Sequence, residues 1–223
     1  MEEKNFADYV TAQEQARTHA EEIQNTRVGG LGGSDAAMVL KLGLHGLNSL
    51  SVTDTKRLCV MLGLCEPDAW GGNVYTNAGH AFEDLAEQTL PFGRNGYERE
   101  KVFAMPLALS FKTFAHADFA CGKEHNDVIE CKFVQDATPK VVQKYYAQLQ
   151  WYYMLGASHV TLYHGRGKSD PFELEEGTVR TIERDEQTIA ALLAGIKLLD
   201  DAIQSGWQPV MPDKVVLSDT PAM

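Results

Sequence analysis

The sequence predicts a single α/β domain with a central mixed β-sheet flanked by helices. The chain has 223 residues, of which 44% are hydrophobic, and this is enough to bury one sizeable core. Strand-like runs concentrate between residues 97 and 134, whereas helical patterns precede and follow them. Because neither a repeat nor a linker interrupts this order, one layered domain covering residues 1–223 is expected.

Helical patterns fill the first part of the chain. Residues 6–24 contain no Gly or Pro and carry a narrow apolar stripe, which predicts an N-terminal helix. Two glycine pairs between Val28 and Ser34 then break the chain, and Ser34 stands where the N-cap of a short apolar helix is expected. Two more helices are expected at 53–63 and 75–90.

Strands dominate the next part of the chain. Three strand-like runs, GYEREKVFAM, LSFKTFAHADFA and NDVIECKFV, precede a helix at 139–155 that begins with a proline, a residue suited to a first helical turn. Two further strands are expected at 159–165 and 177–184, and an amphipathic helix at 185–204. The tail at 207–223 contains three prolines and is expected to be irregular.

The composition limits the possible functions. A formal net charge of -11 argues against a general nucleic-acid coat protein, which is usually basic, but it does not exclude an enzyme that needs clustered carboxylates. No run of 18 or more apolar residues is present, so no membrane association is expected. The acidic, polar N-terminus does not have the layout of a signal peptide, and a cytoplasmic location is expected. The four cysteines form no CxxC pair, which disfavours a zinc knuckle and predicts ordinary reduced thiols.

The segment HADFACGKEHNDVIECKF carries the strongest chemical signal. Side chains alternate along a strand, so Glu130 and Lys132 point to one face while Ile129 and Cys131 point to the other. The turn before this strand predicts a hairpin, which would bring Asp118 beside Glu130. The sequence thus predicts two carboxylates and an ammonium on one side of a sheet.

Such a trio suits phosphodiester hydrolysis. Two carboxylates can bind Mg²⁺ or Mn²⁺, and the metal polarises a phosphate oxygen and activates a water molecule. A lysine beside them favours an anionic phosphate transition state over the acid–base work of a glycosidase pair. The alternative is a surface hairpin with an incidental ion pair, because Glu-x-Lys is common on strands.

Two flanking helices add polar groups. Glu83 borders the apolar face of the helix expected at 75–90 and could reach the sheet as a third carboxylate, or it could only interact with the helix dipole. Tyr145, Gln148 and Tyr152 share one face of the next helix. Gln148 could hold a water molecule or a phosphate oxygen, whereas the tyrosines are expected to pack on the sheet.

An anion site is possible near the N-terminus. Glycine pairs let a backbone approach a phosphate, a helix that starts at Ser34 favours anions at its N-terminus, and Arg27 could add a charged fork. The alternative is a plain loop before a capped helix. His116 could support Asp118 and His80 lies near Glu83, but the histidines are too dispersed for a zinc site.

The ordered series GHAFE, AHADF, IECK and YYAQLQ resembles the PD-(D/E)xK nuclease superfamily, and more narrowly the YqaJ-like phage recombination exonucleases typified by lambda exonuclease. The resemblance covers a core of about residues 26–205 and implies a restriction-endonuclease-like core. One departure is Ala117, where these enzymes usually have proline before the motif aspartate.

The resemblance implies a role for each matching residue. Asp118, Glu130 and the backbone carbonyl of Cys131 would bind Mg²⁺, with Mn²⁺ expected to substitute. Lys132 would position the nucleophilic water, and Glu83 would assist at a second metal or orient water.

Further roles follow from the same resemblance. Gln148 would complete the wall of the active site, and Arg27 and Ser34 would grip a terminal 5′-phosphate.

The implied function is 5′-to-3′ digestion of double-stranded DNA ends, which leaves 3′ overhangs for recombination by single-strand annealing. The implied assembly is a ring-shaped homotrimer, whose channel could be locally basic despite the acidic exterior, with a single-strand-annealing protein as partner. A phage or prophage gene expressed in the cytoplasm of a bacterial host is expected. A restriction-type or structure-specific endonuclease on the same core, and a non-catalytic DNA-end-binding protein of this fold, remain alternatives.

Overall fold

A computed structural model of the full chain describes residues 28–66, 74–89, 96–104, 108–121, 126–135 and 138–210. The elements are, in chain order, β1 (Gly30–Leu31), η1 (Gly33–Asp35), α2 (Ala36–His45), η2 (Leu47–Ser49), α3 (Val52–Met61), α4 (Val74–Thr89), β2 (Glu98–Ala104), β3 (Lys112–Cys121), β4 (Asp127–Phe133), α5 (Thr138–Met154), β5 (His159–Ser169), β6 (Phe172–Ile182) and α6 (Glu186–Gln204). The helix predicted at 6–24, the candidate residue Arg27 and positions 211–223 of the predicted tail lie outside the described residues.

The strands form one mixed six-stranded sheet in the order β1–β3–β4–β5–β6, and β2 also pairs with β3. The pairs β2–β3, β3–β4 and β5–β6 are antiparallel, whereas β1–β3 and β4–β5 are parallel. Parallel strands need a crossover connection, and α5 supplies it between β4 and β5. The predicted α/β fold with a central mixed sheet is therefore confirmed.

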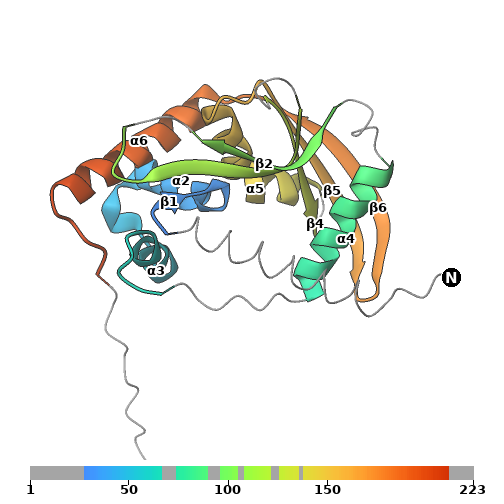
Figure 1. Cartoon of the computed structure of the whole chain (residues 1–223), viewed down its shortest axis with the longest axis horizontal. Coiled ribbons are helices and arrows are strands. Elements are labelled where there is room, and N and C mark those ends of the chain that lie inside the picture. Colours follow the sequence, from blue (N-terminus) through green and yellow to red (C-terminus); the bar gives the residue numbers. More distant parts are fainter. Residues whose placement is uncertain are drawn as a thin grey trace, which may run out of the picture.

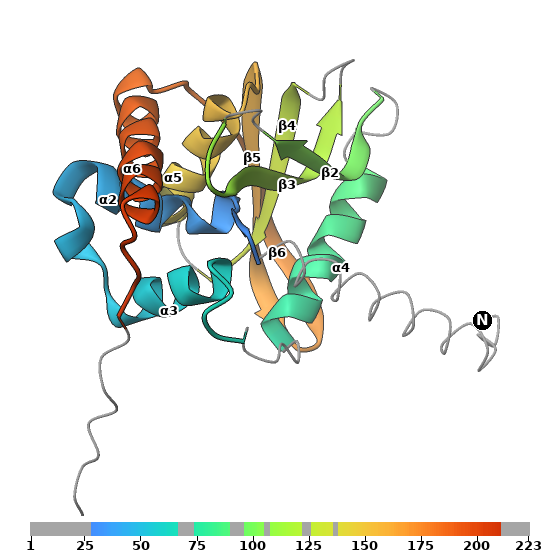
Figure 2. The same cartoon turned by 60° about the vertical axis from the view of Figure 1, so that its left-hand side comes forward.

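Helices cover both faces of the sheet (Figures 1 and 2). Helix α4 packs on β4, β5 and β6 on one face, and α5 packs on β5 on the other, with α6 and α2 behind it. The apolar residues separate in the same way. The smaller cluster lies under α4 and consists of Phe82, Ala86, Phe119, Ile129, Cys131 and Tyr163. The larger cluster joins α2, α5 and α6 to the other face.

The hairpin of β5 and β6 is longer than predicted. The sequence predicts strands only at 159–165 and 177–184, because RGKSDPFELEE between them is rich in charged and turn-forming residues. These charges instead pair across the two strands: Arg166 lies 3.2 Å from Glu176, and Lys168 lies 2.7 Å from Glu173. Cross-strand ion pairs thus support strands that lack an apolar pattern.

Within the described residues, the other predicted helices and strands are present, most of them with ends shifted by one to three residues. All four cysteines are free thiols. Within the described ranges, no helix has the length and apolar character required to cross a bilayer. The four described residues of the predicted tail, 207–210, form neither helix nor strand.

Helices α2 and α6 cross with their backbones in contact. A Cβ atom built on Gly43 would lie 1.8 Å from the carbonyl oxygen of Ala191, and one built on Gly195 would lie 2.1 Å from that of Val39. Side chains larger than hydrogen cannot be accommodated at either position unless the helices separate.

We therefore expect Gly195→Ala to destabilise the protein by about 3 kcal/mol, because the added methyl group overpacks a rigid helix contact. The matched control is Gly79→Ala in α4, where a Cβ atom meets nothing within 4 Å. This variant should gain about 0.5–1 kcal/mol from the higher helix propensity of alanine. Urea unfolding measures both changes. Equal midpoints for Gly195→Ala and the wild type would contradict the close helix contact.

Candidate active site

Strands β3 and β4 separate at Asp118. Their antiparallel pairing runs from Cys121 opposite Asp127 to Phe119 opposite Ile129 and ends there. The next residue, Asp118, uses its side chain instead: its Oδ2 accepts a hydrogen bond of 2.6 Å from the backbone N–H of Cys131. The predicted hairpin therefore does place Asp118 beside the strand that carries Glu130.

The residue opposite Asp118 in the neighbouring strand β2 also departs from regular strand pairing. In β2, Arg99 pairs with Phe119 and Lys101 with Ala117, but Glu100 between them does not pair with Asp118. Glu100 has a φ of 54°, in the left-handed region. This conformation costs about 1–3 kcal/mol in a residue with a side chain, and such strain concentrates at functional sites. The backbone thus departs from regular pairing on both sides of Asp118.

Glu130 is the most enclosed carboxylate of the site, with 1% of its surface exposed. Its Oε1 accepts hydrogen bonds from Lys132 Nζ and, at 2.7 Å, from Gln148 Nε2. Its Oε2 accepts one of 2.5 Å from the hydroxyl of Tyr152. A carboxylate has about four lone-pair positions, so three donors fix its orientation and leave about one position open.

Lys132 lies on the same face as Glu130, as strand alternation predicts. Burial alone would lower the pKa of Lys132, but the negative charges of Glu130 and Asp118 raise it above its ordinary value of 10.5. Its Nζ also lies 5.3 Å from the centre of the Tyr145 ring, a cation–π distance. At neutral pH, Lys132 is an ammonium that donates hydrogen bonds and cannot accept a proton.

Asp118 has unbalanced negative charge around it. Burial raises the pKa of Asp118 well above 3.8, and the charge of Glu130 raises it further, whereas Lys132 lowers it. One lysine thus does not compensate two carboxylates, and a cation bound between them would relieve this imbalance. The oxygen donors suit Mg²⁺ or Mn²⁺.

A metal here would take only part of its ligands from the protein. Within the described ranges, no three Asp, Glu, His or Cys side chains converge as a metal site. Asp118 and Glu130 contribute two carboxylates. In an extended strand the N–H and C=O of one residue point to the same edge, so the carbonyl of Cys131 faces Asp118 as its N–H does. Mg²⁺ commonly keeps several water ligands, so this partial set fits it.

Glu83 approaches the site but is engaged elsewhere. Its Oε2 lies 3.3 Å from the guanidinium of Arg99 in β2 and 3.5 Å from His80 Nδ1. Its charge still contributes to the raised pKa of Asp118, after burial and Glu130. The role of Glu83 at a second metal therefore stays a prediction, and Arg99 is a partner that the sequence analysis did not identify.

The glycine-rich turn differs from its prediction in one respect. Helix α2 begins at Ala36 with Asp35 as its N-cap, whereas Ser34 lies one residue earlier, inside the 3-10 turn η1, and is exposed. The prediction that Ser34 caps this helix is wrong. The physical reason is that Asp35 folds back onto the turn, where its Oδ2 accepts a hydrogen bond of 2.8 Å from the backbone N–H of Gly32.

Arg57 holds the same aspartate from α3. Its Nε and Nη2 atoms each lie 2.8 Å from a carboxylate oxygen of Asp35, and Nη2 is also 2.8 Å from the carbonyl of Gly30. A bidentate contact of this kind fixes geometry as well as charge. An internal carboxylate and arginine thus stabilise the turn before any ligand binds.

The turn lies against the face of α5 that carries Gln148. A Cβ atom on Gly33 would be 3.4 Å from the Cγ of Gln148, the residue whose amide binds Glu130. The structure therefore brings Asp118, Glu130, Lys132 and Gln148 together and places Ser34 at their margin.

Tyr152 is the main site residue that the sequence analysis assigned only to packing. It is buried and lies four residues after Gln148, on the same helical face. A buried tyrosine hydroxyl usually has a hydrogen-bond partner, and this expectation could have identified it. Arg57 and Arg99 had no comparable signal, because their partners lie far away in sequence.

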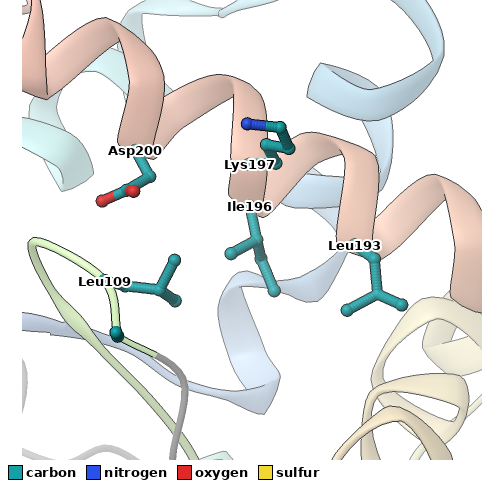
Figure 3. A pocket seen from close by; sticks show the side chains of 6 residues that line it. Leu109, Leu193, Ile196, Lys197 and Asp200 are labelled. Atoms are coloured by element: carbon teal, nitrogen blue, oxygen red, sulfur yellow. The ribbon is translucent and has the colours of Figure 1, made fainter.

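A separate pocket of about 370 Å³ lies between α6 and the segment before β3 (Figure 3). It is lined by Ala108, Leu109, Leu193, Ile196, Lys197 and Asp200. The carboxylate of Asp200 accepts hydrogen bonds of 2.7 Å from the N–H of Ser110 and the amide of Gln204. With its one carboxylate satisfied in this way, the pocket offers no pair of catalytic groups.

The sequence matches no protein-family model and no curated protein. Solved structures do resemble it. A phage-related exonuclease from Haemophilus somnus 129PT aligns with a TM-score of 0.55 at 15% identity, over 83% of this chain and 100% of that one. LHK-Exo, an alkaline exonuclease from Laribacter hongkongensis, aligns in its complex with dAMP with a TM-score of 0.55 at 18% identity, over 83% of this chain and 97% of that one. The chain therefore has the fold of phage-related and alkaline exonucleases, as its resemblance to the YqaJ-like group predicted.

The contact of Tyr152 with Glu130 leads to a prediction. Tyr152→Phe removes one of three donors that orient the carboxylate, and we expect it to weaken Mg²⁺ binding or activity about 10–100-fold, as is typical for residues that orient metal ligands. The matched control is Tyr146→Phe on the same helix, α5. This change removes a hydroxyl that lies 3.0 Å from the carboxylate of Asp185. Calorimetric titration with Mg²⁺ measures both variants, and equal affinities would contradict the role of Tyr152.

The raised pKa of Asp118 predicts a pH dependence. In the folded protein the Asp118 carboxyl group keeps a proton that the unfolded chain releases near pH 3.8. The contribution of this proton to folding stability is therefore complete below that pH and is lost as the pH rises through the folded-state pKa of Asp118. Mg²⁺ would bind the ionised form, so the gain in Tm from Mg²⁺ should increase from acidic to alkaline pH. Thermal unfolding tests this, with Asp118→Asn as control. A gain that is independent of pH would contradict it.

Proposed function

We propose that this protein is a metal-dependent exonuclease that digests one strand of duplex DNA from a 5′ end and leaves a 3′ overhang for recombination by single-strand annealing. The observation that carries the proposal is the Glu130 carboxylate, which Lys132, Gln148 and Tyr152 orient beside Asp118. The fold shared with phage-related and alkaline exonucleases supports it.

The residues of the site suit phosphodiester hydrolysis. Asp118, Glu130 and the carbonyl of Cys131 would hold Mg²⁺, or Mn²⁺ in its place. The bound metal would supply positive charge at the phosphate and activate a water molecule for attack. Gln148 and Tyr152 keep Glu130 in one orientation, which reduces the reorganisation that metal binding requires.

Lys132 would act as a permanent cation at the phosphate. Its raised pKa keeps it protonated, so it can orient the nucleophilic water and stabilise the negative charge that develops on phosphorus-bound oxygens. A glycosidase pair would instead need one carboxylic acid and one carboxylate about 5–9 Å apart around a sugar. The ammonium of Lys132, which is bound to Glu130, favours the phosphate substrate.

The end preference of the proposed reaction would come from the glycine-rich turn. The exposed Ser34 follows Gly33, where an added Cβ atom would meet Gln148, so a phosphate held at Ser34 would lie near the proposed catalytic groups. Because the Asp35 carboxylate occupies the turn and pairs with Arg57, such a phosphate also needs a further cation, which Arg27 would supply. The choice of the 5′-phosphate follows from the resemblance to YqaJ-like enzymes.

The proposed setting also follows from that resemblance. It comprises a homotrimeric ring around the DNA, a single-strand-annealing protein as partner, and a phage or prophage gene expressed in the cytoplasm of a bacterial host. A ring is compatible with the net charge of -11, since a locally basic channel can coexist with an acidic exterior.

Digestion of end-labelled DNA tests the proposed polarity. A linear duplex labelled at the 5′ end should lose its label before a duplex labelled at the 3′ end, in the presence of Mg²⁺, and a 5′-phosphate should accelerate the reaction. Digestion from 3′ ends would overturn the polarity. Cleavage of a circular plasmid would indicate an endonuclease, and binding to ends without cleavage would indicate a DNA-end-binding protein.

The role of Lys132 gives a further prediction. Lys132→Ala should reduce cleavage of linear duplex DNA at least about 100-fold, because it removes a charge that stabilises the transition state, while DNA binding changes little. Lys168→Ala is the control, since it removes a lysine that pairs with Glu173 on the distant hairpin. Cleavage assays and gel-shift titrations measure the two effects. Wild-type cleavage by Lys132→Ala would exclude the proposed mechanism.

A further inference from the structure

Arg99 in β2 binds a row of three carboxylates on α4. Its guanidinium lies 2.7 Å from Asp84, 3.2 Å from Glu87 and 3.3 Å from Glu83. Arg99 also lies over the ring of Phe119 in β3, with 5.7 Å between the guanidinium carbon and the ring centre. The arginine is therefore held between a helix and the sheet by ion pairs and a cation–π contact.

This ion-pair cluster borders the catalytic groups. Arg99 lies opposite the residue that follows Asp118 in the β2–β3 ladder. Phe82, the residue before Glu83, packs in the same apolar cluster as the two residues that flank Glu130. Arg99 is thus paired with the residue next to Asp118. Glu83 follows a residue that packs against the neighbours of Glu130. Both partners of the ion pair therefore lie close to the proposed metal site.

The backbone supports this placement. Glu100, immediately after Arg99, has a φ of 54° and lies where a partner of Asp118 would be expected. A left-handed residue with a side chain persists only where its surroundings determine the backbone. The contacts of Arg99 with α4 and Phe119 provide such a constraint.

We propose that Arg99 is a positioning residue that holds the Glu83 carboxylate on α4, so that a metal ion first binds Asp118 and Glu130 alone and gains Glu83 only when the Arg99–Glu83 ion pair opens. This inference depends on the proposed metal-dependent function. Asp84 and Glu87 share the positive charge of Arg99, so the arginine remains anchored on α4 even when Glu83 leaves it.

The proposal makes the metal affinity of the free protein depend on Arg99. In Arg99→Gln, Glu83 loses the arginine that pairs with it, and its carboxylate can turn toward the metal. A carboxylate ligand gained in this way should lower the Kd for Mn²⁺ about 10-fold, equivalent to about 1.4 kcal/mol. Glu83→Gln in the wild-type background should change the Kd less than about 3-fold, because Glu83 does not yet bind the metal.

The experiment is a calorimetric titration of the full chain with Mn²⁺ in the absence of DNA. The variants are Arg99→Gln, Glu83→Gln, the double variant and Asp118→Asn. The matched control is Arg166→Gln, which makes the same change of net charge at an exposed pair with Glu176. The proposal predicts that Arg99→Gln binds Mn²⁺ more tightly than Arg166→Gln, and that the double variant returns to the affinity of Glu83→Gln.

Two results would overturn the inference. The first is an Mn²⁺ affinity of Arg99→Gln equal to that of Arg166→Gln, and the second is a double variant that binds as tightly as Arg99→Gln. If Arg99→Gln does not fold, Arg99→Lys decides the question. A lysine cannot contact three carboxylates with one planar fork, so this variant should tighten Mn²⁺ binding about 3-fold, and no change would overturn the proposal.

The same titration separates this inference from the proposed function. If the wild type binds Mn²⁺ no better than Asp118→Asn, the metal-dependent function itself fails. If the wild type binds Mn²⁺ through Asp118 but Arg99→Gln behaves as the wild type does, only the role of Arg99 fails.

Discussion

The site depends on one hydrogen bond, from the backbone N–H of Cys131 to the side chain of Asp118. A regular antiparallel pair would have joined the two strands at this position and left no space between them. The carboxylate instead takes the place of a backbone carbonyl, and the strands separate where Glu130 and Lys132 emerge. On the other side of Asp118, the left-handed backbone of Glu100 adds a conformational cost of its own.

Beside this separation of the strands, hydrogen bonds hold the side chain of Glu130 in one orientation. The Glu130 carboxylate would be unfavourable in its buried position without its three donors, and these come from strand β4 of the sheet and from the helix that packs on it. The long helix α5 supplies two of them. Helix α5 in turn packs on α2 and α6, which contact each other closely at Gly43 and Gly195. Packing between helices thus contributes to the geometry of the carboxylate pair.

Periodicity explains which parts of the structure can be predicted from the sequence. The period of two in a strand places Glu130 and Lys132 on one face of β4. The spacing of four residues in a helix places Gln148 and Tyr152 on one face of α5. The contacts of Arg99 with α4 and of Arg57 with Asp35 have no period, since they join surfaces that only the folded chain brings together. Composition gives a wrong prediction at the β5–β6 hairpin. Its charged residues indicate a loop, but in the structure they form ion pairs across two strands. The cap of α2 was misplaced by one residue because Asp35 competes with Ser34 for the same turn.

The acidic outer strand has a consequence for how copies of this chain could meet. Strand β6 is the last of the sheet order, so one of its edges has no neighbour within the described sheet. Exposed charged residues, among them Glu173, Glu175 and Glu176, lie along it. Charged side chains on an edge strand disfavour the addition of another strand, which protects the protein from uncontrolled sheet extension. Any closed assembly of this chain is therefore expected to form through side-chain surfaces elsewhere and not through a sheet continuous between subunits at β6.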